Sequence, residues 1–342
     1  MTRDWRKWML VGLVGVAVAA TASQASSVTP VSLAQRHDGG RVVVDSFWSQ
    51  ALGIRKQVRV YLPASYDVAA SRRFPVAFYL HGAWGSEQDW STLGRLPATL
   101  DSLIARGLPE LIVVMPDGDD SWYTTWNWLG DWPGCRRHPP RAGEAADRYC
   151  VPWPHYDDYI ARDLVSYIDG HYRTHADRAH RGIAGLSMGG YGAVSLALAY
   201  PDVFAAAASH SGTLAPALGA VPPGSDTSRY ATQLADLRSR YDSALWKLME
   251  PAFGKDSAAW SARDPIQLAT RAMQRKSVLP ALYADCGVDD SFLAQNRFFA
   301  RAARRMGISL DYTEYPGAHE WGYWRAHAVQ SLRWLAARIA AP

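Results

Sequence analysis

The sequence predicts an α/β fold in which helices cover both faces of a mostly parallel sheet and long loops cross its carboxyl edge. From residue 74 onwards, short apolar runs typical of strands alternate with segments of helical periodicity, as this architecture requires. A Gly-Leu-Ser-Met-Gly pentapeptide at residues 185–189 stands between an apolar run and a helix-like segment. The chain has 342 residues, 48% of them hydrophobic, which is sufficient for one substantial core.

The individual elements follow from the same patterns. Residues 41–47 and 57–62 alternate between apolar and polar side chains, as expected of two antiparallel strands at the start of the sheet. The remaining elements are expected in this order: a strand at 74–80, a helix at 96–105, a strand at 111–115, a helix at 159–171, a strand ending at 187, a helix at 191–198, strands at 204–209 and 278–284, a helix at 292–306, a strand at 308–315 and a C-terminal helix.

Ser187 is the candidate nucleophile. It lies at the centre of the pentapeptide, where a strand, a sharp turn and a helix would lift its hydroxyl above the carboxyl edge of the sheet. In so tight a turn the side chains two residues on either side would collide, and both positions, 185 and 189, are glycine. A serine that merely forms a turn is the alternative, and residues further along the chain disfavour it.

A carboxylate and a histidine follow in the order that this turn requires. Asp289 and Asp290 lie in a loop after the strand at 278–284, and His319 lies in a loop after the strand at 308–315. His319 would remove the proton of Ser187 and return it to the leaving group, while one of the two carboxylates would orient the imidazole. The residues alone leave Asp289 and Asp290 both open for that role.

An oxyanion hole completes the expected site. In this architecture one backbone N–H comes from the residue after the nucleophile, here Met188, and a second comes from the loop after an early strand. Residues 81–85, His-Gly-Ala-Trp-Gly, form that loop, and Ala83 is the expected second donor. His81 is expected to hold the loop in place rather than to bind a metal.

Five motifs in this order resemble the esterase D group of the α/β-hydrolases, from about residue 41 to the C-terminus. They are Tyr-Leu-His-Gly at 79–82, Val-Met-Pro-Asp-Gly at 114–118, Gly-Leu-Ser-Met-Gly-Gly at 185–190, Cys-Gly-Val-Asp-Asp at 286–290 and Pro-Gly-Ala-His at 316–319. The group includes S-formylglutathione hydrolases, short-acyl and feruloyl esterases, and secreted mycolyltransferases. The resemblance implies an α/β-hydrolase fold and a cofactor-free serine acyl hydrolase or acyltransferase.

The resemblance also implies a choice between the two acids. The group's acid usually stands three residues after the glycine of the Cys-Gly motif, so the implied triad is Ser187, Asp290 and His319. Mycolyltransferases carry Asp-Gly where this chain has His81-Gly82, and Glu as the triad acid. Both departures favour the esterases over mycolyl transfer.

The amino terminus predicts export. Three basic residues precede an apolar run at 8–20, and small residues at 20–22 and 23–25 suit a signal peptidase. An uncleaved membrane anchor is the alternative, but the run is shorter than the ~20 residues that span a bilayer. We therefore expect a signal peptide at 1–25, a linker at 26–40, a single catalytic domain at 41–342, a secreted or periplasmic location and no stable membrane insertion after cleavage.

Cysteine and charge patterns add two expectations. In an oxidising compartment Cys135 and Cys150, which flank one polar loop, are a candidate disulfide, whereas Cys286 is expected to be a small core residue. No Cys/His spacing indicates a metal site. The formal net charge of +4 falls to about +2 without the signal peptide, and basic residues are not interleaved with aromatics, so nucleic acid is not an expected partner.

Two long insertions, at 117–155 and 212–262, leave the carboxyl ends of strands and should overhang Ser187. The first is rich in Trp. Trp84, Trp122 and Trp126 are candidates for contact with a sugar ring or an aromatic acyl group, and filling of the core is the alternative. The expected function is a secreted serine carboxylesterase acting on a short-acyl or carbohydrate-linked ester. Acyl transfer to a sugar is the alternative, and a non-catalytic binding module is disfavoured by the intact triad.

Overall fold

The structure, a computed structural model, describes residues 35–36, 39–126, 132–137, 145–225 and 234–340. Its contacts separate Met1–Ser32 from a compact unit, Leu33–Pro342, and the description below concerns that unit alone. Within the described ranges no helix is both long enough and apolar enough to cross a bilayer.

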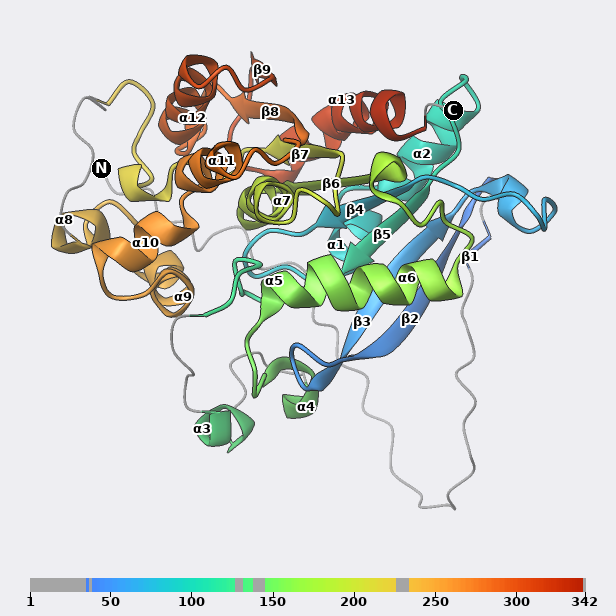
Figure 1. Cartoon of the computed structure of the whole chain (residues 1–342), viewed down its shortest axis with the longest axis horizontal. Helices are drawn as coiled ribbons and strands as arrows, with labels where there is room; N and C mark the ends of the chain where they lie inside the picture. Colours follow the sequence, from blue (N-terminus) through green and yellow to red (C-terminus); the bar gives the residue numbers. More distant parts are fainter. Residues whose placement is uncertain (1–34, 37–38, 127–131, 138–144, 226–233, 341–342) are drawn as a thin grey trace, which may run out of the picture. The chain divides into compact units, whose positions relative to one another are not determined.

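A nine-stranded sheet forms the centre of this unit, in the order β1-β2-β3-β5-β4-β6-β7-β8-β9 (Figure 1). The first three strands pair antiparallel, β3 pairs antiparallel with β5, and all strands from β5 to β9 are parallel. The strands are β1 (Gln35–Arg36), β2 (Arg41–Ser49), β3 (Ile54–Leu62), β4 (Val76–Leu80), β5 (Ile112–Pro116), β6 (Arg181–Leu186), β7 (Ala206–His210), β8 (Ala281–Gly287) and β9 (Leu310–Tyr315).

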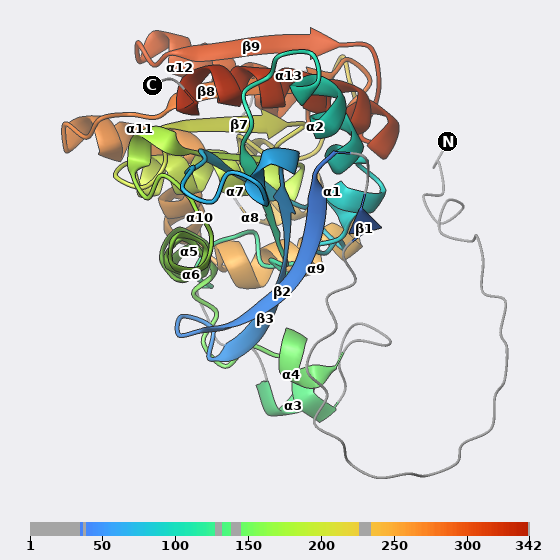
Figure 2. The same ribbon diagram turned by 90° about the vertical axis from the view of Figure 1, so that its right-hand side faces the viewer.

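Helices lie on both faces of the sheet, as the alternating pattern predicted (Figure 2). They are α1 (Asp89–Thr92), α2 (Leu96–Ile104), α3 (Trp132–Arg137), α4 (Ala146–Tyr149), α5 (Tyr156–Asp158), α6 (Val165–His171), α7 (Met188–Ala199), α8 (Leu234–Arg238), α9 (Ser243–Phe253), α10 (Ser257–Arg263), α11 (Pro265–Gln274), α12 (Leu293–Arg305) and α13 (Trp321–Ile339). A π-helical turn, Tyr159–Leu164, precedes α6, and short 3₁₀ turns occupy Ala64–Tyr66, Arg178–His180 and Pro216–Leu218.

The central strands bury side chains on both faces, so their sequences are almost continuously apolar. In β4, Phe78 enters a core shared with α6, α7 and α12, and Tyr79 enters a second core shared with α2 and α13. All five residues of β4 and all five of β5 are buried. Strand β2, which lies beside the two-residue edge strand β1, alternates between more and less exposed positions from Val43 to Ser49, in agreement with its predicted pattern.

Most predicted boundaries differ from the observed ones by one to three residues, and two of the differences involve a distinct local feature. The strand expected at 278–284 begins at Ala281, because Pro280 has no N–H for the ladder and Val278 is exposed. The helix expected at 159–171 begins with the π-helical turn before α6 continues it. Neither shift moves a predicted site residue away from the carboxyl edge.

Candidate active site

Ser187 occupies a strained turn between β6 and α7. Its backbone has φ 52° and ψ −118°, outside the regions that non-glycine residues prefer. A Cβ on Gly185 would lie 2.3 Å from the carbonyl oxygen of Gly189, and a Cβ on Gly189 would lie 2.4 Å from the carbonyl oxygen of Leu80. Both glycines are therefore required, as predicted. The Ser187 N–H donates to the carbonyl of His210 at 2.9 Å, which ties the turn to β7.

The structure brings Ser187 together with the predicted histidine and acid. His319, in the loop between β9 and α13, has its Nε2 2.9 Å from Ser187 Oγ and its Nδ1 2.9 Å from Asp290 Oδ2. An ionised carboxylate can only accept, so Nδ1 carries the proton and the lone pair of Nε2 faces the serine hydroxyl. The rings of Phe292 and Trp324 each lie edge-on to the imidazole with centroids 4.9 Å away, which restricts its rotation.

Asp289 and Asp290 have opposite environments. Asp290 is fully buried, and its second oxygen accepts the N–H of Phe292 at 2.8 Å. Asp289 is exposed, and its backbone N–H donates to the carbonyl of Gly317. Burial by itself would raise the pKa of Asp290, but the electrostatic interaction with His319 and the hydrogen bonds that Asp290 accepts outweigh it and lower that pKa below its ordinary value.

The segments that carry the two expected oxyanion donors both lie close to Ser187. Met188 is the first residue of α7, where backbone N–H groups have no partner within the helix. Ala83 follows Gly82, whose Cβ position would lie 3.4 Å from the Cβ of Ser187, so the loop after β4 passes directly beside the nucleophile.

Contacts from the insertion hold this loop in place. His81 donates from Nδ1 to the carbonyl of Gly82 at 2.8 Å and accepts the N–H of Gly118 at Nε2 at 2.9 Å. The N–H of Trp84 donates to the carboxylate of Asp120. The backbone on both sides of Ala83 is thus fixed by side-chain contacts, and His81 has the supporting position expected of it.

The residues that contact the loop after β4 belong to a segment with a strained backbone, residues 117–123. Three non-glycine residues in it have positive φ: Asp119 at 49°, Trp122 at 59° and Tyr123 at 50°. The Trp122 N–H points at the sulfur of Met188, 3.4 Å away, and the Tyr123 hydroxyl donates to the carbonyl of His81 at 3.1 Å. The 117–123 segment therefore contacts both parts of the expected oxyanion hole.

Sequence reasoning missed the ion cluster beneath this segment. The Lys56 ammonium, wholly buried, donates to Asp117 at 2.6 Å and to Asp119 at 2.8 Å, and the Tyr156 hydroxyl donates to Asp119 at 2.6 Å. Burial raises the pKa of Asp119 to about 7 although Lys56 opposes it, whereas Lys56 and His81 lower the pKa of Asp117 despite burial. The Asp-Gly-Asp-Asp run at 117–120 is the only local signal, and Lys56 lies 61 residues before Asp117.

The three candidate tryptophans have different positions. Trp122 is 0% exposed and packs edge-on to Tyr191 and Phe253, at centroid distances of 5.8 and 5.5 Å. The expectation that Trp122 offers a surface to substrate is therefore wrong, because its ring forms part of the core. Trp126 is half-buried, and Trp84 is 55% exposed.

The predicted disulfide between Cys135 and Cys150 is present and joins the segments of α3 and α4. Cys286 is free and buried, as expected of a small core residue. Among the described residues, no three His, Cys, Asp or Glu side chains gather so that they could hold a metal ion.

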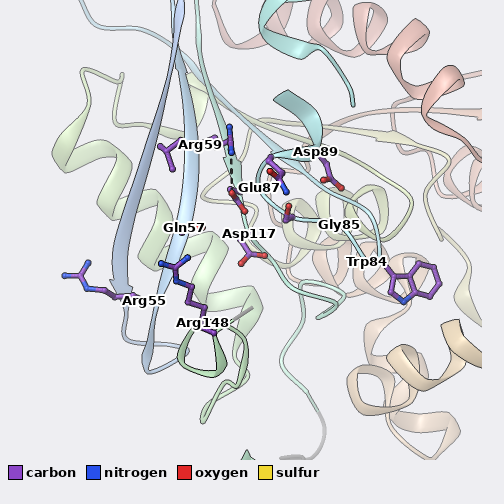
Figure 3. Close-up of a pocket in the computed structure, with 13 residues that line it drawn as sticks. Arg55, Gln57, Arg59, Trp84, Gly85, Glu87, Asp89, Asp117 and Arg148 are labelled. Carbon is purple, nitrogen blue, oxygen red and sulfur yellow. Dashed lines mark ion pairs between the residues drawn. The ribbon is translucent and has the colours of Figure 1, made fainter. Parts of the chain in front are cut away.

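A polar pocket of about 780 Å³ lies between β3 and the loop that follows Trp84 (Figure 3). Arg59 and Glu87 form an ion pair across it at 3.6 Å. Trp84 and Gly85, next to the expected oxyanion hole, are among its lining residues. The other charged and amide side chains of the lining are Arg55, Gln57, Gln88, Asp89, Asp117 and Arg148.

Known proteins that are similar to this chain are named esterases. The family described as “Putative esterase” matches residues 49–335. An esterase from Mycobacterium tuberculosis is 29% identical over 283 residues, covering 80% of this chain and 54% of the relative, so the chain spans about half the length of that protein. An acetyl esterase from Caldicellulosiruptor saccharolyticus is 25% identical over 266 residues, covering 78% of this chain and 84% of the relative.

A solved structure of a ferulic acid esterase superposes with a TM-score of 0.59 at 27% identity, covering 88% of this chain and 98% of the other. The predicted α/β-hydrolase fold is confirmed by this likeness and by the strand order. Because the family match spans most of the sequence, the chain belongs to this esterase family, as the resemblance of its motifs predicted.

Proposed function

We propose that the protein is a serine carboxylesterase with Ser187 as nucleophile, His319 as general acid and base, and Asp290 as the orienting acid. The observation that carries the proposal is the chain of contacts from Ser187 Oγ through both imidazole nitrogens to Asp290, with 2.9 Å at each link. Relatives named esterases support the reaction class.

The geometry suits a two-step reaction. Ser187 Oγ attacks the ester carbonyl carbon while its proton moves to His319 Nε2, and the tetrahedral intermediate then expels the alcohol, which takes that proton. Water attacks the acyl-enzyme with the same base, and the acid is released as Ser187 regains its proton. Asp290 stabilises the imidazolium throughout and does not itself become protonated.

The backbone N–H groups of Met188 and Ala83 are proposed as the oxyanion hole. These N–H groups do not have to reorient during the reaction. Helix α7 fixes the first, and the contacts of His81 and Asp120 fix the loop that carries the second. Each such donor typically contributes ~3–4 kcal/mol to transition-state stabilisation.

The polar pocket suggests the alcohol portion of the substrate. Its lining mixes guanidinium, carboxylate and amide groups, which together offer donors and acceptors to a molecule with many hydroxyls. The exposed indole of Trp84 beside it could stack against a sugar ring. We therefore propose a carbohydrate-linked ester with a short acyl group as substrate and water as the acyl acceptor.

Export is part of the proposal. The disulfide requires an oxidising compartment, in agreement with the expected signal peptide at 1–25, which lies outside the described residues. N-terminal sequencing of protein recovered outside the cytoplasm should show a first residue at Ser23 or Ser26. A chain that still begins at Met1 would contradict cleavage.

The decisive experiment is Ser187→Ala. The variant should lose hydrolysis of p-nitrophenyl acetate and of acetylated or feruloylated sugars, and a fluorophosphonate should label the natural protein at Ser187 alone. Cys286→Ala serves as the control, because it removes a buried thiol on β8 that the proposed mechanism does not use. Activity retained in Ser187→Ala would refute the mechanism, and an ester of an added alcohol as main product would favour transfer over hydrolysis.

A further inference from the structure

A second serine, histidine and aspartate are linked by hydrogen bonds in the interior of the fold, on elements that also carry the proposed catalytic residues. His210 Nδ1 lies 2.7 Å from Asp285 Oδ2, and His210 Nε2 lies 2.8 Å from Ser331 Oγ. The connectivity is that of a catalytic triad, but all three residues are 0% exposed. A substrate cannot reach Ser331, so the arrangement must serve another purpose.

Three tyrosines complete this group, which we call the His210 cluster. The hydroxyl of Tyr283 donates to Asp285 Oδ2 and that of Tyr323 to Asp285 Oδ1, each at 2.9 Å, and the hydroxyl of Tyr79 lies 3.1 Å from Ser331 Oγ. A buried carboxylate is tolerated only when its hydrogen bonds are made, so removal of one partner is costly. The members must therefore keep a fixed mutual geometry.

The cluster joins elements that carry the proposed catalytic groups. The carbonyl of His210, on β7, accepts the N–H of Ser187 at 2.9 Å. Asp285 lies on β8, five residues before Asp290. The ring of Tyr323, on α13, lies against the backbone of the loop that holds His319.

The fourth element is β4, which leads to the oxyanion loop. Tyr79 lies on it, two residues before His81, and Ser331 on α13 bridges Tyr79 to His210. Four segments that are far apart in the sequence thus meet in one hydrogen-bonded group below the site.

We propose that the His210 cluster is a positioning group, which sets the separation of Ser187, His319 and Asp290 through these four elements. The inference rests on the proposed serine mechanism. A displacement of about 1 Å among reacting groups can lower a rate about 100-fold, so a small shift of the His319 loop should be visible in kcat.

Two matched substitutions test this proposal, because each removes one tyrosine hydroxyl that donates to the carboxylate of Asp285. Tyr323→Phe cuts the bond between Asp285 and α13. Tyr283→Phe cuts a bond between two residues of β8 and an interaction with Tyr315 on β9, and it leaves the bonds from α13 to Asp285 and His210 in place. Tyr323→Phe should lower kcat and the rate of inactivation by a fluorophosphonate about 10- to 100-fold, with KM within about twofold of the natural protein. Tyr283→Phe should keep kcat within about threefold.

Ser331→Ala and Thr174→Val extend the comparison. Ser331→Ala should behave like Tyr323→Phe, because it detaches α13 from His210. Thr174 is equally buried and donates to Asp169 at 2.6 Å beside the start of β6, at the opposite edge of the sheet from Ser187. Thr174→Val should lower Tm by a similar amount and leave kcat unchanged.

The outcomes separate this inference from the mechanism on which it rests. The first contrary outcome has Ser187→Ala inactive, as the mechanism requires, and Tyr323→Phe and Ser331→Ala with a lower Tm but the same kcat as Thr174→Val. In that case the cluster only stabilises the fold and the inference is wrong. If Ser187→Ala keeps its activity, the serine mechanism fails and the inference fails with it.

Discussion

Two neighbouring carboxylates show how much the surroundings of a residue decide its role. Asp290 turns inward, where His319 and the N–H of Phe292 compensate its burial, and Asp289 turns towards solvent. The sequence-based choice between them depended on the spacing of a motif. The geometry supplies the physical reason, because only Asp290 reaches Nδ1 of the imidazole.

Asp290→Asn should lower kcat by roughly 10³- to 10⁴-fold, because an amide at this position no longer holds the proton on Nδ1. Asp289→Asn, its matched control, should keep nearly full activity. Steady-state kinetics on p-nitrophenyl acetate, with Tm recorded for both variants, checks the ranking. If the two variants ranked in the reverse order, the orienting role would move to Asp289.

At the scale of elements, the 117–123 segment connects the insertion to the proposed oxyanion hole. It stores backbone strain at three residues and packs Trp122 into the core. The strain is compensated by the contacts that the segment makes with Lys56, His81 and Met188. The insertion thus supports the proposed site through these internal contacts.

Trp84→Ala and Trp122→Ala should therefore have different effects. Trp84→Ala should raise KM for carbohydrate-linked esters and leave both Tm and the hydrolysis of p-nitrophenyl acetate nearly unchanged, because its ring is exposed beside the polar pocket. Trp122→Ala should destabilise the fold by ~3–5 kcal/mol, as expected for a buried ring. Denaturant unfolding measures the stability of each variant, and kinetics on a panel of esters measure KM. If the two variants lost the same stability, the proposed role of Trp84 in substrate binding would be contradicted.

The sequence predicted those features that have a local signal. Strand and helix periodicity located the sheet, and the tight turn, its two glycines and the order of residues located Ser187 and His319. The ion cluster of Lys56, Asp117 and Asp119 and the His210 cluster were missed because the contacts that define them join distant residues. Lys56 and Asp117 lie 61 residues apart, His210 and Ser331 lie 121 residues apart, and each residue alone looks like an ordinary strand or helix residue. Composition also could not show which tryptophans point inward, which is why the expectation for Trp122 was wrong.

For the whole molecule, the buried charges of the Lys56 cluster make stability depend on pH. The pKa of Asp119 is about 7 in the folded protein and about 3.9 in an unfolded chain. Between these values the folded state binds a proton that the unfolded state has released. The free energy of unfolding should therefore fall as pH rises from about 4 to about 7.

Asp119→Asn should remove this dependence, because the amide does not titrate. As pH rises from about 4 to about 7, the free energy of unfolding of the natural protein should fall relative to that of the variant by at most roughly 1.4 kcal/mol per pH unit. Denaturant unfolding at several pH values between 4 and 8 measures the difference, with the exposed Asp289→Asn as control. If the free energy of unfolding had the same pH dependence in Asp119→Asn and in the natural protein, Asp119 would be ionised in the folded state across the whole pH range.

The position of α13 has a consequence for synthesis. A ribosome releases Ser187 long before His319, and Tyr323 and Ser331 follow later still. A nascent chain that ends before residue 319 therefore contains the nucleophile without its base, and one that ends before α13 also lacks the contacts that join β4, β7 and β8 to that helix. Hydrolytic activity should arise in one step, after residue 331 has left the ribosome, and not gradually as the sheet grows.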